Sequence, residues 1–188
     1  RKEYAKRNNI KYLSELTRKY KKAFIVPEGG NNKLGILGAE EILEKQDKSF
    51  DYIICPIGTG ATLSGIVNSS NKTQKLIGIN CINDTKDINK NISQKTNKNN
   101  WEIINEFNFG GFAKFDNLLT EYLKKFKLNY KITLDLNYTT KMFFGFEKLI
   151  ERRYFQRKSK VLLIHTGGTY GNLGFNYLYD LDLPHESN

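Results

Sequence analysis

The sequence has few of the residues that build metal sites and disulfide frameworks. Its 188 residues include two cysteines and two histidines, and no pair among them has the spacing of metal ligands. We therefore expect no metal site built on these side chains. Cys55 and Cys81 each fall inside an apolar run, which predicts buried, reduced thiols and a cytoplasmic location.

Long hydrophobic runs are also missing. No apolar stretch approaches the ~20 residues that span a membrane, and none has the form of a signal peptide, so we expect no membrane partner. The hydrophobic content of 39% and the aromatic content of 13% nevertheless exclude a disordered tail. A chain of this length can form one domain with a buried core.

Positive charge, by contrast, is in excess, with a formal net charge of +10. This charge fits nucleic-acid binding, but it also fits a surface enriched in lysine and asparagine by compositional bias. The lysines are scattered along the sequence, and no nucleic-acid-binding motif is present. We favour the second interpretation and expect no nucleic-acid partner.

Apolar and amphipathic stretches alternate along the chain. Apolar runs predict strands at 22–27, 52–57, 75–82 and 160–165. Amphipathic stretches predict helices at 1–20, 36–46, 61–70, 117–126 and 142–155. Polar composition predicts loops at 28–35 and 166–172 and a mobile or helical surface segment at 83–100. The alternation predicts an α/β fold of three αβα layers around a mostly parallel, doubly wound sheet.

The stretch "GTGATLSG" lies between a predicted strand and a predicted helix. Its glycines let backbone N–H groups approach a ligand, its threonines add hydroxyl donors, and the helix start adds the positive end of a dipole. These features are typical of a phosphate cradle. The residues concerned are Gly58, Thr59, Gly60, Ala61 and Thr62.

Three kinds of phosphate ligand compete for this loop. A P-loop nucleotide site needs a lysine, and none occurs between Gly58 and Val67. A dinucleotide-binding site needs the pattern GxGxxG, but the third glycine here, Gly65, comes two positions too late. It also needs an acidic residue at the end of the next strand, where this chain has Asn80. The lone phosphate of a small cofactor or substrate remains. A plain strand-to-helix turn explains the loop equally well.

A second glycine loop, "HTGGTYGN", follows the strand predicted at 160–165. Because ligands bind at the carboxyl ends of parallel strands, we expect both loops on one rim of the sheet. His165 ends the strand, and a satisfied core or rim histidine is favoured over a catalytic one. In "DLNYTTKMFFGFEKL", Thr139 or Thr140 is expected to cap the helix that follows.

Four blocks of the sequence together resemble one family of enzymes. "VPEGGNNKLGILGAEEI", "CPIGTGATLSGIV", "DLNYTTKMFFGFEKL" and "VLLIHTGGTYGN" occur in the order seen in the 1-aminocyclopropane-1-carboxylate deaminase / D-cysteine desulfhydrase family. The resemblance covers most of the chain from about Phe24 onward. It implies the tryptophan-synthase-β-like fold (fold type II), pyridoxal 5'-phosphate as cofactor, a small amino acid as substrate and a homodimer.

The resemblance also implies roles for individual residues. The cradle 58–62 would bind the cofactor phosphate, Tyr138 would be a catalytic residue beside the substrate, and Thr139 would face the pyridine nitrogen. Thr166 and Gly167 would contact the substrate. The position of Thr139 is typically glutamate in the deaminases and threonine in the desulfhydrases. A carboxylate stabilises a protonated ring and a hydroxyl cannot, so Thr139 favours a desulfhydrase.

Two departures from the family pattern stand out. Phe112, in "FNFGGFAKF", replaces a second active-site tyrosine and removes a hydroxyl. The family's Schiff-base lysine and its substrate-binding serine lie in an N-terminal segment that has no counterpart here. Lys33 and Lys141 do not occupy the position of that lysine, and we expect them to be surface or loop-lining residues.

The chain begins with Arg1 inside a polar helical pattern, which suggests a segment of a longer polypeptide. We expect residues 1–27 to be the end of the family's small domain and residues 28–188 to be the large, phosphate-binding domain. The expected function is the C-terminal part of a D-cysteine desulfhydrase-like enzyme, which eliminates sulfide and yields pyruvate and ammonia. This chain alone would be inactive without the lysine. The alternatives are an aminocyclopropane-carboxylate deaminase and a truncated, non-catalytic remnant.

Overall fold

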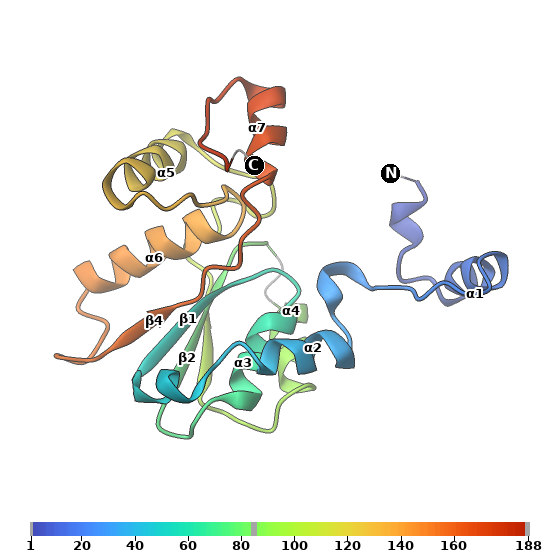
Figure 1. Cartoon of the computed structure of the whole chain (residues 1–188), viewed down its shortest axis with the longest axis horizontal. Coiled ribbons are helices and arrows are strands. Elements are labelled where there is room, and N and C mark those ends of the chain that lie inside the picture. Colours follow the sequence, from blue (N-terminus) through green and yellow to red (C-terminus); the bar gives the residue numbers. More distant parts are fainter. Residues whose placement is uncertain (1, 84–85, 187–188) are drawn as a thin grey trace.

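The computed structural model describes residues 2–83 and 86–186 (Figure 1). Its sheet has the order β3-β2-β1-β4, and every neighbouring pair in it is parallel. The strands are β1 (Tyr52–Ile57), β2 (Lys75–Asn80), β3 (Trp101–Ile104) and β4 (Val161–Leu163). The predicted parallel sheet is therefore confirmed.

Helices cover both faces of this sheet (Figure 1). α2 (Lys33–Glu40), α3 (Ala61–Ser69) and α4 (Lys86–Ser93) lie on one side. α5 (Asn117–Tyr130), α6 (Thr139–Glu151) and α7 (Gly171–Tyr179) lie on the other. α1 (Ile10–Lys19) stands apart, and short 3-10 turns occur at η1 (Tyr4–Lys6), η2 (Glu28–Gly30) and η3 (Lys45–Ser49). The three-layer αβα prediction is confirmed.

Burial of β1 on both faces explains why its sequence is an uninterrupted apolar run. Ile53, Cys55 and Ile57 pack with α3 and α4 in one core cluster. Tyr52 and Ile54 pack in the other cluster, with residues of α5, α6 and α7. Successive strand residues point to opposite faces, so a strand covered on both sides needs apolar residues throughout. Cys55 and Cys81 are buried and free, as the sequence predicts.

The strand predicted at 22–27 is wrong. This segment is an extended connection between α1 and η2, and it pairs with none of the described strands. Phe24 and Val26 are about two-thirds exposed, at 68% and 67%. Their apolar pattern resembles that of a strand, but a strand also needs a neighbour for its backbone N–H and C=O groups.

Other boundaries shift by a few residues. α2 begins at Lys33, inside the predicted loop 28–35, because the side chain of Asn32 accepts a hydrogen bond from Gly35 N at 2.9 Å and caps the helix. It ends at Glu40, six residues before the predicted end. Within the predicted polar segment 83–100, α4 confirms helical structure, whereas Asp84 and Thr85, like Arg1, lie outside the described residues. β3 and α7 were not anticipated from the sequence.

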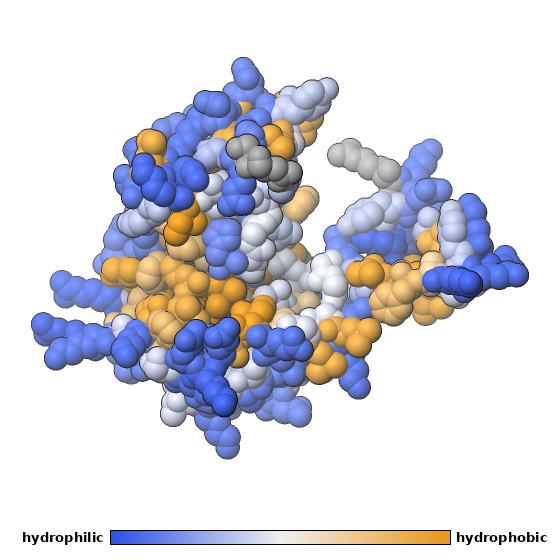
Figure 2. Space-filling model, in the orientation of Figure 1, coloured by the Kyte–Doolittle hydropathy of each residue, from blue (hydrophilic) through white to orange (hydrophobic). Residues whose placement is uncertain are grey.

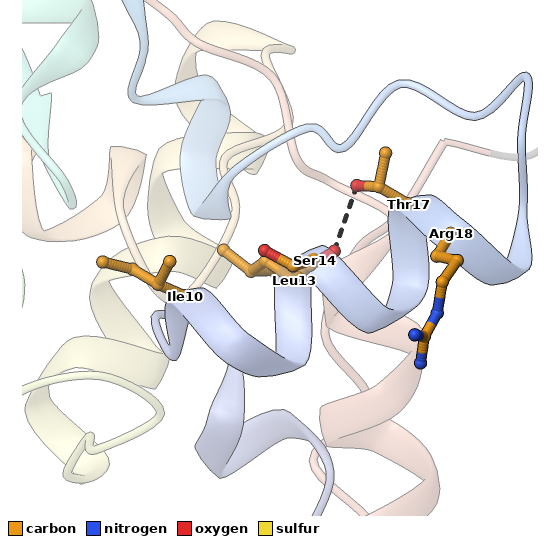
Figure 3. Close-up of a pocket in the computed structure, with 5 residues that line it drawn as sticks. All are labelled: Ile10, Leu13, Ser14, Thr17 and Arg18. Carbon is orange, nitrogen blue, oxygen red and sulfur yellow. Dashed lines mark hydrogen bonds between the residues drawn. The ribbon is translucent and has the colours of Figure 1, made fainter.

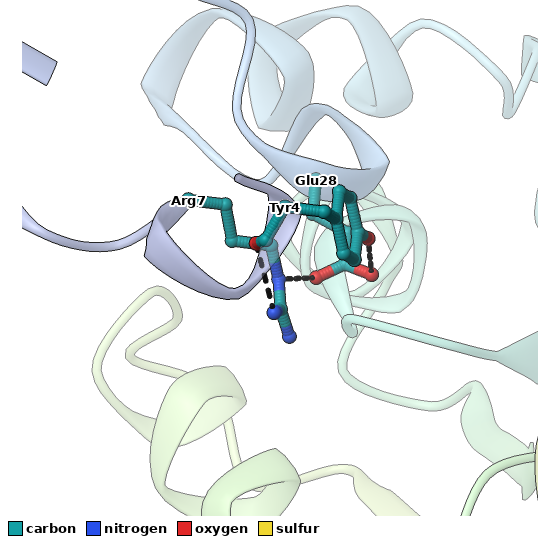
Figure 4. A network of polar contacts seen from close by, with 3 residues as sticks. All are labelled: Tyr4, Arg7 and Glu28. Atoms are coloured by element: carbon teal, nitrogen blue, oxygen red, sulfur yellow. Dashed lines mark hydrogen bonds and ion pairs between the residues drawn. The ribbon is translucent and has the colours of Figure 1, made fainter. Parts of the chain in front are cut away.

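The N-terminal segment is tied to the body through Glu28. The Tyr4 hydroxyl donates to Glu28 Oε1, and Arg7 Nε donates to Glu28 Oε2 at 2.7 Å (Figure 4). These contacts lower the pKa of Glu28, mainly through the hydrogen bond from Tyr4 and then that from Arg7. Glu28 opens the η2 turn, so the contacts connect η1 to the loop preceding α2.

Two surface hollows lie away from the glycine loops. One, of about 480 Å³, is formed by one side of α1, with Ile10, Leu13, Ser14, Thr17 and Arg18 along it (Figure 3). The other, of about 760 Å³, lies beside β4 and is lined by Phe146, Ile150, Phe155 and Val161, with Arg153, Arg157 and Ser159. Apolar surface is visible over this edge of the sheet in Figure 2. Among the helices described, none combines the length and the apolar character needed to cross a bilayer.

Candidate cofactor and substrate site

The two glycine loops lie on one rim of the sheet, as predicted. β1 ends at Ile57 and leads into Gly58–Gly60, and the adjacent parallel strand β4 ends at Leu163 and leads into residues 164–170. Parallel neighbours have their carboxyl ends on the same edge, which is where α/β folds bind ligands. The loop before α6 meets both, because Asp135 lies near Gly168 and Tyr138 lies near Gly58.

The loop after β1 has the geometry of an anion cradle. Gly60 has φ +88° and occupies the N-cap position of α3, and no side chain caps this helix. The first N–H groups of α3 are therefore left to face a ligand or solvent, and the dipole favours an anion there. A Cβ added at Gly60 would lie 3.0 Å from Ile92 Cγ1, so the space beside this residue is also tight.

Neighbouring elements close in on the cradle. A Cβ on Gly58 would lie 3.1 Å from Tyr138 Cε1, and a Cβ on Gly29 would lie 2.7 Å from Thr59 Oγ1. The η2 turn thus abuts one side of the loop and the Tyr138 ring abuts another. Ala61 is buried, and Thr62 is half-buried at the start of α3. These residues fit a small phosphate-bearing cofactor.

Tyr138 and Phe112 lie side by side next to this loop. Their ring centroids are 6.2 Å apart, and Phe112 is 59% exposed. Burial, reinforced by the nearby Cys81, Asp135 and Glu28, raises the pKa of Tyr138 to about 12. The Tyr138 hydroxyl therefore keeps its proton at neutral pH and can act as a hydrogen-bond donor. Phe112 offers an apolar face in place of a second hydroxyl.

Tyr138 occupies the N-cap position of α6 and no side chain caps the helix from there, so the predicted cap at Thr139 or Thr140 is wrong. The turn that leads into α6 is held by Asp135 instead. Its carboxylate accepts hydrogen bonds from the backbone N–H groups of Asn137, Tyr138 and Thr139, at 2.8–2.9 Å, and Thr139 is the first residue of the helix. The Thr140 hydroxyl donates to the Asp135 carbonyl oxygen at 2.7 Å. A negative charge at this end of α6 also complements the helix dipole.

Thr139 is fully buried and bonded to Asp135 in both directions. Its hydroxyl donates to Asp135 Oδ2 and accepts from Asp135 N, each at 2.7 Å. A role toward a ring nitrogen, which the family resemblance implies, stays a prediction. Any such role has to share this hydroxyl with Asp135.

The second glycine loop presents backbone and small side chains at the rim. His165 Nδ1 accepts from Gly167 N at 3.1 Å, so its other nitrogen, Nε2, donates to the Thr133 carbonyl oxygen at 2.9 Å. Both ring nitrogens therefore have partners, one in this loop and one at Thr133, in agreement with the predicted rim histidine. Thr166 is exposed and Gly167 has φ +76°. Their substrate contacts stay predictions.

The two lysines considered from the sequence differ sharply in their surroundings. Lys33 is exposed at the start of α2. Lys141 is fully buried in the first turn of α6, and its Nζ bonds the carbonyl oxygens of Cys81, Asn108 and Gly111. It is thus no surface residue, but it does line loops, and its amine is occupied.

Sequence reasoning missed Asp135 and Asn137, which organise the start of α6. Asp135 stands four residues before Thr139, and an aspartate whose side chain accepts from the N–H two residues on is typical of a turn. Asn137 Oδ1 accepts from Ala113 N at 2.9 Å and ties the Phe112 loop to α6. No local sequence signal identifies that second contact.

Comparison with known proteins identifies relatives over most of the chain, although no family model matches it. A Thermotoga maritima protein with the provisional name 1-aminocyclopropane-1-carboxylate deaminase is 29% identical over 173 residues, covering 82% of this chain and 54% of the relative. The 1-aminocyclopropane-1-carboxylate deaminase of Rhizobium radiobacter is 24% identical and covers 84% and 54%. The mitochondrial bifunctional D-cysteine desulfhydrase/1-aminocyclopropane-1-carboxylate deaminase of Arabidopsis thaliana is 28% identical and covers 84% and 44%. The chain spans about half the length of the curated relatives it matches.

Solved structures share the fold. A crystal structure of a homologue of ACC deaminase superposes with a TM-score of 0.75 at 24% identity, covering 89% of this chain and 56% of that one. The processed form of threonine deaminase isoform 2 from Solanum lycopersicum superposes with a TM-score of 0.54 at 14% identity, covering 89% and 52%. The chain therefore shares the α/β fold of these two structures.

Proposed function

From the similarity of this chain to members of the 1-aminocyclopropane-1-carboxylate deaminase / D-cysteine desulfhydrase family, we propose that it is the C-terminal part of a pyridoxal-phosphate-dependent enzyme of the D-cysteine desulfhydrase type. The reaction would be β-elimination from a D-amino acid, giving pyruvate, ammonia and sulfide. The relatives and the shared fold support the family and the use of this cofactor. The substrate and the residue roles are our proposals.

The uncapped, glycine-lined start of α3 carries this proposal. Gly58, Thr59, Gly60, Ala61 and Thr62 would hold the cofactor phosphate, since the first-turn N–H groups of α3 have no side-chain cap. Pyridoxal phosphate, when bound, supplies an electron sink that weakens the bonds at the α-carbon of an amino acid. The cradle would hold the phosphate end, and Tyr138, which lies beside Gly58, would then be available to the reacting end.

Tyr138 would be the catalytic residue that this chain supplies. Its pKa, raised to about 12, keeps a proton on Oη at neutral pH. That O–H can donate a hydrogen bond to the substrate carboxylate. Phe112, beside it, would give one wall of the site an apolar face. Thr166 and Gly167, on the neighbouring loop, would contact the substrate.

Thr139 supports the desulfhydrase over the deaminase. A hydroxyl at the position expected to face the ring nitrogen cannot hold that nitrogen protonated as a carboxylate would. The nearest carboxylate described here, Asp135, already accepts three backbone N–H groups and the Thr139 hydroxyl. Such a site suits the elimination of a good leaving group, for which a weaker electron sink is sufficient.

A deaminase is the second candidate, because the relatives in Thermotoga maritima and Rhizobium radiobacter have that name. The two activities separate by product. We expect sulfide from D-cysteine and little 2-oxobutyrate from 1-aminocyclopropane-1-carboxylate when the complete polypeptide is assayed with pyridoxal phosphate. 2-Oxobutyrate as the major product would overturn the desulfhydrase assignment.

A non-catalytic remnant is the third candidate, favoured by the half-length match to the relatives. The purified chain should bind pyridoxal phosphate reversibly in equilibrium dialysis, and borohydride should trap none of it on a lysine. Trapping on Lys141 or any other lysine would show that the chain carries its own cofactor-linking residue. The division into a small-domain end (1–27) and a large domain (28–188), and the homodimer, remain proposals of the same family reasoning.

A further inference from the structure

Lys141 is a buried cation for which the proposed chemistry provides no role. Its side chain has an exposure of 0%, and it lies in the first turn of α6, at the positive end of the helix dipole. Both conditions disfavour an ammonium group, and burial lowers its pKa from the usual value. Such a placement persists only where the group makes specific contacts.

Those contacts go to loop backbone. Lys141 Nζ lies 2.7 Å from the carbonyl oxygen of Gly111, 2.9 Å from that of Asn108 and 3.3 Å from that of Cys81. An ammonium group has three protons to donate, so the three carbonyls use all of them. The residue joins the end of β2, the turn at 108–113 and the start of α6 at one point.

The 108–113 turn has a backbone that needs such support. Phe109 and Ala113 have φ of 54° and 55°, in the left-handed region that non-glycine residues seldom adopt. Gly110 and Gly111 also have positive φ, at 89° and 111°. Conformations of this kind persist when the surroundings over-determine them.

Two residues near the start of α6, one before and one after Tyr138 in the sequence, hold the 108–113 turn. Asn137 Oδ1 accepts from Ala113 N at 2.9 Å, and Lys141 holds the carbonyls of Asn108 and Gly111. Phe112 is the residue between these two ties, and its ring faces Tyr138. The placement of Phe112 relative to Tyr138 is therefore set by Asn137, one residue before that tyrosine, and by Lys141, three residues after it.

We propose that Lys141 is a positioning residue, whose ammonium group fixes the 108–113 turn so that Phe112 and Tyr138 together form the substrate wall beside the phosphate cradle. The role in substrate binding rests on the proposed function, whereas the tie to the turn does not. In the described part of the chain, Lys141 Nζ bonds the carbonyls of Cys81, Asn108 and Gly111 and none of residues 58–62. The effect of Lys141 should therefore fall on the amino-acid end of a ligand and leave the phosphate end unchanged.

Two ligands distinguish binding at the phosphate end from binding at the amino-acid end. Pyridoxal phosphate alone reports on the cradle, and N-(phosphopyridoxyl)-D-alanine, a stable reduced conjugate, reports on the cradle and the wall together. For Lys141→Met we expect conjugate affinity to fall about tenfold, the loss typical of a charged hydrogen-bonded tie, with pyridoxal phosphate affinity nearly unchanged. Amide hydrogen exchange over residues 105–115 should rise in the same variant.

A double-mutant cycle tests whether Lys141 acts through Phe112. Phe112→Ala alone should weaken the conjugate, and adding Lys141→Met to it should cost little more, because coupled residues are non-additive. Lys127→Met is the matched control, since Lys127 bonds Lys131 and Thr133 and not the turn. If Lys141→Met does not fold, Lys141→Arg, which keeps the charge but moves the donors, replaces it in the cycle.

Failure of the proposed function and failure of the positioning role of Lys141 would give different results. Absence of pyridoxal phosphate binding in the wild-type chain would overturn the proposed function, and with it the wall, while the exchange data would still decide the tie to the turn. Normal cofactor binding with additive effects of the Lys141 and Phe112 substitutions would overturn the positioning role. Unchanged exchange at 105–115 in the Lys141 variant would do the same.

Discussion

Two hydrogen bonds join Thr139 to Asp135. The Thr139 hydroxyl donates to Asp135 Oδ2 and accepts from the Asp135 backbone N–H, each at 2.7 Å. This pair anchors the turn that carries Tyr138 into the site. The hydroxyl that the family resemblance assigns to the cofactor ring is thus also a structural element of α6. Replacing Thr139 therefore tests stability and function together, and the two need separate measurements.

Thr139→Val should destabilise the protein by about 1–3 kcal/mol, because it removes both bonds and leaves the buried Asp135 N–H without its acceptor. Urea denaturation of the chain measures this. The control is Thr17→Val, at an exposed hydroxyl on α1 that donates to the Leu13 carbonyl oxygen, where the change should stay within about 0.5 kcal/mol. Equal losses in the two variants would contradict the importance assigned to the Thr139–Asp135 pair.

Asp135→Ala should cost more than the loss of an ordinary helix cap. Asp135 accepts three backbone N–H groups and the Thr139 hydroxyl, whereas Asp116, the cap of α5, accepts only from Leu119 N. We expect about 2–3 kcal/mol for Asp135→Ala and about 1 kcal/mol for Asp116→Ala in denaturant unfolding. The reverse order would show that the contacts of Asp135 stabilise the protein less than the cap of α5 does.

Gly60→Ala should damage the cradle. The position has φ +88°, and the new Cβ would lie 3.0 Å from Ile92 Cγ1, so we expect a loss of about 1–3 kcal/mol and weaker pyridoxal phosphate binding in dialysis. Gly174→Ala is the matched control, because a Cβ inside α7 meets nothing within 4 Å and should stabilise by up to about 1 kcal/mol. Unchanged cofactor binding in the Gly60 variant would exclude this loop as the phosphate site.

The two thiols should be inert in the folded protein. Burial raises the pKa of Cys55 and of Cys81 from 9.0 to about 12, with Lys141 opposing part of the effect at Cys81. A raised pKa means that the folded state holds these protons more tightly than the unfolded state. The contribution to stability is therefore present below pH 9 and is lost as the pH rises through 12.

Thiol labelling at pH 8 checks this directly. We expect negligible reaction with an aromatic disulfide reagent in the native chain and reaction of both cysteines in urea. Rapid labelling of the native chain would show that a thiolate is accessible, contrary to the burial of both residues.

The sequence pattern predicted those elements whose burial follows from their own residues. β1 and α3 match closely, because an apolar run covered on both faces leaves one arrangement available. The strand expected around Phe24 failed, because its apolar residues are exposed and no described strand pairs with it. An apolar pattern alone does not tell whether another strand is available to pair with the segment.

Some residues of the candidate site were also predictable from their own sequence, and others were not. The glycine loops were found from the sequence because positive φ and close packing require glycine there, as at Gly60. Burial of Lys141 was not predictable from local sequence, since lysine is ordinarily exposed and its partners are backbone groups 30 to 60 residues away. Asp135 could have been recognised from its position before α6.

The exposed connection between α1 and η2 is a site where a protease should cut the chain. Lys21 and Lys22 lie there outside any helix or strand, in an exposed turn of the kind that proteases cut. After one cut, the N-terminal piece is held by the contacts of Glu28 with Tyr4 and Arg7, and exposed ion pairs of this kind contribute little to stability. A brief digestion should therefore release α1 and leave a protease-resistant body beginning near Ala23, a compact starting material for crystallisation that retains the glycine loops intact.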